Sequence, residues 1–130
     1  MILVAEDDEP LRRLAARVLR NAGYDVLEAA DGEEALTCAL DHGHIDLLIT
    51  DIAMPAMGGV ELARRLSACD ADMRVIYMSG YSEAAVSRHE ELLADASWMT
   101  KPFTMAEFLR RVRNTLEATR EAGACVTFQP

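Results

Sequence analysis

Side chains that can bind metal ions and phosphoryl groups stand at the ends of four short apolar segments. These are residues 2–5 followed by Glu6, Asp7 and Asp8, residues 45–50 followed by Asp51, residues 75–78 followed by Ser79, and residues 97–100 followed by Lys101. In open parallel α/β sheets, ligands bind outside the carboxyl ends of the strands. If the segments are strands of one such sheet, their terminal groups converge. Carboxylates suit a divalent cation, and a hydroxyl and an ammonium suit the oxygens of a phosphoryl group.

The acids after the first segment would repel Asp51 if they converged on it without a counter-ion. Mg²⁺ removes that repulsion, because it prefers carboxylate oxygens, carbonyls and water and often shares its shell with phosphate. Three consecutive acids offer two ligand pairs, Glu6 with Asp7 or Asp7 with Asp8. Asp8 is equally well explained as the N-cap of the helix that follows. We therefore expect a Mg²⁺ site that includes Asp7, with Asp8 as the less favoured ligand.

The segments that position these residues alternate with helical patterns, which is typical of repeated βαβ units around a parallel sheet. The pattern predicts strands at 2–5, 24–29, 45–51, 73–78 and 97–100. It predicts helices at 10–22, 32–42, 81–94 and from 104 onward, and one more that follows Gly58 and Gly59 and packs residues 60–66 inward. The segment 81–94 has few inward-facing apolar residues, so we expect it to be the least stable helix. Residues 1–120 form one domain in this interpretation, and residues 121–130 a disordered tail.

Composition excludes several classes of protein. The chain has 130 residues, a formal net charge of −9 and 51% hydrophobic residues, enough for a packed core. The acidic balance argues against direct binding of nucleic acid. No apolar run approaches the ~20 residues that span a bilayer, and no signal peptide is visible. Three cysteines, far apart and without metal-ligand spacing, indicate reduced thiols. We therefore expect a cytoplasmic protein.

Four stretches of the sequence together resemble the response-regulator receiver domain of two-component signalling, over residues 2 to about 116. They are "LVAEDDEPLRR", "DLLITDIAMPAMGG", "VIYMSGYS" and "TKPF", in the family's order and at its spacing. The resemblance implies a doubly wound, flavodoxin-like (βα)5 fold with a five-stranded parallel sheet in the order 2-1-3-4-5. Matching the first motif back from Arg12 favours Glu6 with Asp7 as the acidic pair.

The resemblance also assigns roles in a Mg²⁺-dependent reaction. Asp51 would accept a phosphoryl group from a histidine kinase or histidine phosphotransfer protein. Asp7 and Asp51 would bind Mg²⁺ directly, Glu6 would bind it through water, and Ala53 would contribute its backbone carbonyl.

Four further residues match positions that respond to the phosphoryl group in the family. Lys101 and Ser79 would contact its oxygens, and Pro102 matches a cis-proline that aims Lys101 inward. Trp98 matches an aromatic residue that rotates on activation. Phosphorylation would then change the surface formed by helix 81–94, strand 97–100 and the last helix, where a downstream protein partner binds.

The sequence therefore predicts a regulatory phosphoacceptor that catalyses only its own phosphorylation and dephosphorylation, as a monomer or weak homodimer. Both stand-alone receivers, including those of the CpdR type, and receiver modules of hybrid histidine kinases in phosphorelays fit the motifs. Starting with Met1 directly before the first strand slightly favours the stand-alone form. A Mg²⁺-dependent phosphohydrolase is less favoured. Such enzymes are expected to have a second Asp two residues after the nucleophile, where this chain has Ala53. A non-phosphorylated interaction module is disfavoured by the complete set of acids, hydroxyl and lysine.

Overall fold

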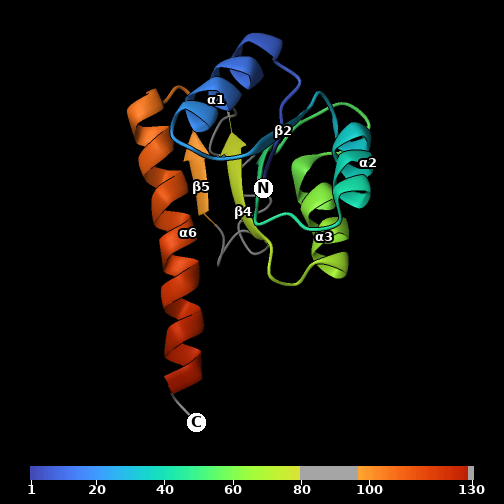
Figure 1. The fold of residues 1–130 in the computed structure, drawn as a ribbon. Coiled ribbons are helices and arrows are strands. Elements are labelled where there is room, and N and C mark those ends of the chain that lie inside the picture. The colour runs from blue at the N-terminus through green and yellow to red at the C-terminus, as the bar shows by residue number, and fades with distance from the viewer. Residues whose placement is uncertain (80–96, 129–130) are drawn as a thin grey trace.

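A central sheet with helices on both faces forms the protein, in a computed structural model that describes the backbone of residues 1–79 and 97–128 (Figure 1). Side chains are described for residues 1–79 and 99–117. The helix expected at 81–94 and the side chain of Trp98 therefore lie outside the described residues.

The sheet of the described residues has five parallel strands in the order β2-β1-β3-β4-β5, which confirms the predicted fold class. The strands are β1 (Ile2–Ala5), β2 (Val26–Ala29), β3 (Leu47–Asp51), β4 (Arg74–Ser79) and β5 (Ser97–Thr100). Residues of β1 and β3 are buried along their whole length, as expected for strands covered on both faces.

Helices cover both faces of this sheet. They are α1 (Glu9–Asn21), α2 (Gly32–His42), α3 (Gly59–Cys69) and α6 (Met105–Phe128). Successive residues of a strand point to opposite faces, and β1 shows the consequence. Leu3 packs in the core beneath α2 and α3, whereas Ile2 and Val4 pack in the core beneath α1 and α6. Two separate apolar cores thus hold the strands rigidly in register.

The first helix begins and ends with local signals that the sequence carries. Asp8 is its N-cap and accepts a hydrogen bond from the amide of Leu11 at 3.3 Å. After the helix, Gly23 has a φ of 100°, which glycine adopts at little cost, and the amide of Tyr24 donates to the carbonyl of Leu19 at 3.1 Å. Tyr24 thus belongs to the helix terminus. For this reason β2 begins at Val26, two residues later than the sequence predicts.

The last helix is longer than expected. It extends to Phe128, so its backbone is helical across residues 121–128, where the sequence predicts a disordered tail. Figure 1 shows this part of α6 projecting beyond the rest of the protein. Helix-forming alanine, glutamate and arginine residues dominate the stretch 117–124, which accounts for continued helical backbone there. Disorder of residues 121–130 in solution stays a prediction.

Gly59, the first residue of α3, lies against the end of β3. A Cβ atom there would lie 2.1 Å from the carbonyl oxygen of Asp51 and 2.9 Å from Oγ1 of Thr50. A backbone carbonyl cannot swing aside as a flexible side chain can, and overpacking costs about 1–3 kcal/mol. We expect Gly59→Ala to lower the free energy of unfolding by about 2 kcal/mol in urea denaturation. Ser67→Ala, at an exposed position of the same helix, is the control. A Gly59→Ala protein as stable as wild type would contradict this packing.

Candidate functional site

The polar residues singled out in the sequence lie at one edge of the sheet. Asp51 is the last residue of β3 and Ser79 the last of β4, while Glu6 directly follows β1 and Lys101 directly follows β5. Glu6 is completely buried, and Asp51 and Ser79 are 6% and 1% exposed. The order of the strands brings these ends together, since β1 and β4 both flank β3 and β5 flanks β4.

Lys101 joins two of the acids. Its Nζ lies 2.5 Å from Oε1 of Glu6 and 3.0 Å from Oδ2 of Asp51. Its backbone amide donates to the carbonyl of Ser79 at 2.7 Å, and the Lys101–Pro102 peptide bond is cis. The ammonium is thus held between two carboxylates that come from different strands.

Three carboxylates at this edge are close enough to share a cation. Oxygens of Glu6, Asp7 and Asp51 all lie within 4.8 Å of one another, and Asp7 is the exposed member of the group. Among the described residues, Asp8 does not belong to this group, because its side chain caps α1. Glu6 accepts a hydrogen bond from the amide of Asp8 at 3.2 Å, which closes the turn between β1 and α1.

The charges of the site depend on one another. The pKa of Glu6 is raised to about 7, chiefly by burial; the hydrogen bond from Lys101 opposes this rise and the negative charge of Asp51 adds to it. Burial alone would lower the pKa of Lys101, but its contacts with Glu6 and Asp51 outweigh burial and raise that pKa. Lys101 therefore remains an ammonium at neutral pH, in a site where carboxylates are in excess.

Two neighbouring residues hydrogen-bond to Asp51, one at its carboxylate and one at its backbone carbonyl. The amide of Ala53 donates to Oδ1 of Asp51 at 3.3 Å, which places Ala53 beside the carboxylate. Thr50, which the sequence reading passed over as part of an apolar strand, is fully buried and donates its hydroxyl to the carbonyl of Asp51 at 3.0 Å. A polar residue within a buried strand was the signal for it.

The lysine content of the sequence is a further indication that Lys101 has a specific role. It is the only lysine of the chain; all the other residues among the 13 Lys and Arg are arginines. Arginine presents a wide planar fork, whereas the lysine ammonium is a compact point charge with three donors. The single lysine thus places its compact ammonium between the carboxylates of Glu6 and Asp51.

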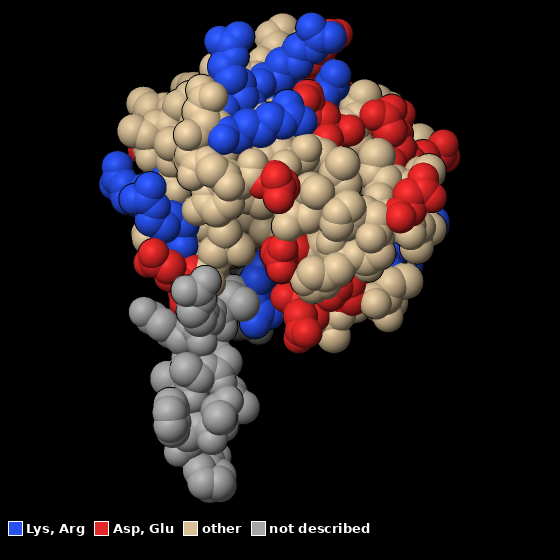
Figure 2. All heavy atoms as spheres, viewed as in Figure 1, with Lys and Arg blue, Asp and Glu red and all other residues tan. Residues whose placement is uncertain are grey.

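Charge on the remaining surface is unevenly distributed. Figure 2 shows basic side chains gathered over α1 and acidic side chains over the side of the molecule where α2 lies. The arginines of α1 are Arg12, Arg13, Arg17 and Arg20.

Among the described residues, no helix is both long enough and apolar enough to cross a bilayer.

The chain belongs to the response regulator receiver domain family, whose profile matches residues 2–113. Members of this family are phosphoacceptor domains of two-component signalling, so the chain is a regulatory signalling domain.

Two curated relatives and one solved structure define the likeness more closely. The chain is 35% identical over 117 residues to the response regulator receiver protein CpdR of Brucella abortus (strain 2308), covering 90% of this chain and 97% of that protein. It is also 35% identical over 117 residues to the sensor kinase CckA of the same strain, covering 89% of this chain but 12% of the kinase. The crystal structure of the receiver domain from the hybrid histidine kinase CckA matches with a TM-score of 0.75 and 38% identity, covering 88% of this chain and 97% of that one.

Proposed function

We propose that Asp51 accepts a phosphoryl group from the phosphohistidine of a histidine kinase or phosphotransfer protein, in a reaction that needs Mg²⁺. The observation that carries this proposal is the setting of the Asp51 carboxylate. It is 6% exposed at the end of a central strand, 3.0 Å from the only lysine, and within metal-ligand spacing of Glu6 and Asp7. A carboxylate so placed has a nucleophilic oxygen, an ammonium beside it and acids that could bind the metal ion, which together suit phosphoryl transfer.

In this reaction an oxygen of Asp51 attacks phosphorus while the bond between phosphorus and the donor atom breaks. Negative charge in the transition state is spread over the equatorial oxygens, so catalysis consists mainly of positioning and charge stabilisation. Lys101, already in contact with Asp51, would meet one of these oxygens. We assign the hydroxyl of Ser79, at the end of the neighbouring strand β4, to another.

The donor set fits Mg²⁺, which is commonly bound by one or two carboxylates with water and phosphate oxygens. We assign Asp7 and Asp51 as direct ligands and the carbonyl of Ala53 as a backbone ligand. Glu6 already contacts Lys101, which suits a role through water rather than direct binding. When bound, Mg²⁺ would supply positive charge that offsets the charge on the phosphoryl oxygens.

We infer that phosphorylation alters the surface formed by helix 81–94, β5 and α6, and that a downstream protein partner binds there. A surface hollow beside β5 and α6 supports this, with Met99, Phe103, Arg110 and Arg111 among its lining residues. The switch role of Trp98 rests on the sequence, as does that of helix 81–94. We propose that the protein works in the cytoplasm, as a monomer or weak homodimer.

Two settings remain for this function. Likeness to CpdR over nearly its whole length favours a stand-alone receiver. Likeness to the receiver domain of CckA favours a module of a hybrid histidine kinase that acts in a phosphorelay. Both settings require the same chemistry at Asp51.

Acetyl phosphate, a small phosphoryl donor, tests the proposed chemistry without a cognate kinase. We expect intact-mass spectrometry to show the gain of one phosphoryl group in Mg²⁺ and none when EDTA removes the metal, because uncompensated carboxylates repel the donor. A rate that EDTA leaves unchanged would contradict the Mg²⁺ dependence. No gain under either condition would contradict the phosphoacceptor function itself.

A further inference from the structure

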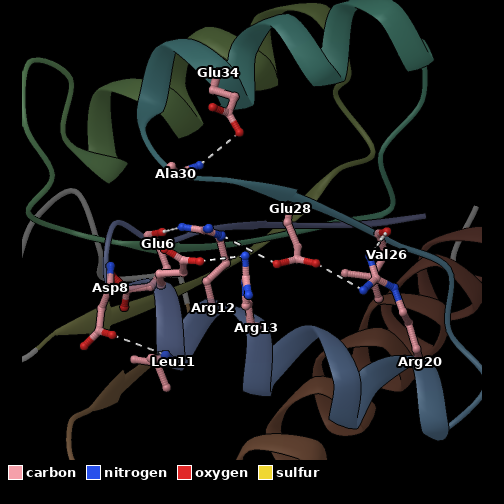
Figure 3. A network of polar contacts seen from close by, with 11 residues as sticks. Glu6, Asp8, Leu11, Arg12, Arg13, Arg20, Val26, Glu28, Ala30 and Glu34 are labelled. Carbon is pink, nitrogen blue, oxygen red and sulfur yellow. Dashed lines mark hydrogen bonds and ion pairs between the residues drawn. The ribbon is translucent and has the colours of Figure 1, made fainter.

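Arg12, in the first turns of α1, reaches back to the acidic group at the end of β1. Its side chain is 13% exposed, and its Nη1 donates to the carbonyl oxygen of Glu6 at 3.0 Å (Figure 3). The other end of that residue still belongs to the sheet, since the amide of Glu6 donates to the carbonyl of Ala29 in β2 at 3.0 Å. Arg12 thus binds the backbone at the point where the chain leaves the sheet.

That carbonyl belongs to the peptide group that joins Glu6 to Asp7. A peptide group is planar, so restraining the direction of its oxygen restricts the orientation of the whole group, including the Cα atoms at both ends. The two Cα atoms carry two of the three acids of the proposed metal site, Glu6 and Asp7. One hydrogen bond from Arg12 therefore restrains the backbone from which both of these acidic side chains extend.

The guanidinium of Arg12 is itself held in place. Its Nε lies 3.5 Å from Oε1 of Glu28 in β2, and Oε2 of Glu28 lies 3.1 Å from Nη1 of Arg20. Nη2 of Arg20 donates in turn to the carbonyl of Val26 at 3.0 Å. Figure 3 shows these contacts as a continuous series along α1 and β2. Ion pairs that solvent still reaches contribute little to stability. We therefore expect these contacts to act mainly by holding the Arg12 guanidinium in position.

We propose that Arg12 is a positioning residue that sets the Mg²⁺ affinity of Glu6, Asp7 and Asp51 by orienting the Glu6–Asp7 peptide group. This inference rests on the proposed function, in which those acids bind Mg²⁺. Groups that orient metal ligands typically change metal affinity about 10–100-fold when they are removed.

The sign of the effect separates positioning from electrostatics. Arg12 carries a positive charge close to a cation site, so loss of its charge alone would strengthen Mg²⁺ binding. Loss of its hydrogen bond would weaken Mg²⁺ binding. Arg17 provides the matched control: it lies on the same helix and is exposed, and its side chain makes no hydrogen bond or ion pair within the described part of the chain. Arg17→Met therefore removes an equal charge and leaves the Glu6 carbonyl untouched.

The single lysine makes the measurement simple. In protein labelled with ¹⁵N-lysine, one backbone amide signal reports on Lys101, whose side chain contacts Glu6 and Asp51. Titration with Mg²⁺ gives a dissociation constant for each variant. We expect Arg12→Met to raise this constant about tenfold, Arg12→Lys to raise it less because an ammonium still donates to a carbonyl, and Arg17→Met to leave it unchanged or slightly lower. Glu28→Gln should produce a smaller rise, and adding it to Arg12→Met should produce none, because Glu28 acts through Arg12.

An Arg12→Met protein that is folded by circular dichroism and binds Mg²⁺ as tightly as Arg17→Met would overturn the proposal. If Arg12→Met does not fold, Arg12→Lys and Glu28→Gln decide, and wild-type affinity in both would overturn it equally. Failure of the proposed function gives a different result, because the wild-type signal would then not respond to Mg²⁺ at all.

Discussion

Replacing Lys101 with methionine is expected to slow phosphorylation by acetyl phosphate about a hundredfold, the loss that follows removal of one preorganised charge donor. It is also expected to lower the free energy of unfolding by about 3 kcal/mol, the low end of the cost of breaking a buried ion pair. Glu6 is fully buried and its pKa is already raised to about 7. Without the hydrogen bond from Lys101 that pKa rises further, so Glu6 takes up a proton at neutral pH, which limits the loss of stability.

Lys101→Arg is the control for this prediction. It keeps the positive charge but replaces a compact ammonium with a planar fork. We expect it to recover most of the stability and less of the phosphorylation rate, measured by urea denaturation and intact-mass time courses. A Lys101→Met protein with wild-type stability and wild-type rate would show that the contacts of Lys101 with Glu6 and Asp51 do not matter.

Asp51→Asn is expected to abolish phosphorylation. The amide has nearly the size of the carboxylate and can still accept the hydrogen bond from the Ala53 amide, but it is not a nucleophile toward phosphorus. Glu6 should not take its place, since its carboxylate is fully buried against Lys101.

Asp46→Asn provides a matched change of charge. Asp46 directly precedes β3, at the opposite end of the strand that Asp51 ends, and its side chain is 51% exposed. We expect intact mass after incubation with acetyl phosphate and Mg²⁺ to show a phosphoryl group on Asp46→Asn and none on Asp51→Asn. A phosphoryl group on the Asp51→Asn protein would mean that another residue is the acceptor.

The sequence predicts those features that depend on local pattern. Leu3 and Leu48 lie in continuous apolar runs because strands covered on both faces need apolar residues at every position. Once such runs are ordered as parallel strands, the residues that end them must meet at one edge. For this reason the sequence alone predicts that Glu6, Asp51 and Lys101 lie together, as they do in the structure.

Features that depend on contacts between distant parts of the chain could not be predicted from the sequence. Arg12 reads as one of several exposed arginines of an amphipathic helix, and only the path of the chain shows that it reaches the Glu6 carbonyl. The sequence leaves Asp8 as either a ligand or a cap, and the structure shows its side chain capping α1. The start of β2 was set by the hydrogen bond of Tyr24 with Leu19, which no periodicity reveals.

The residue that carries the phosphoryl group can be identified by chemical reduction. Wild-type protein phosphorylated by acetyl phosphate in Mg²⁺ is treated with borohydride, which reduces an aspartyl phosphate to homoserine, and is then digested and sequenced by tandem mass spectrometry. We expect homoserine in place of Asp51 and at no other aspartate. Homoserine in place of Asp7 or Asp46, or a phosphoryl group that resists borohydride, would contradict this expectation.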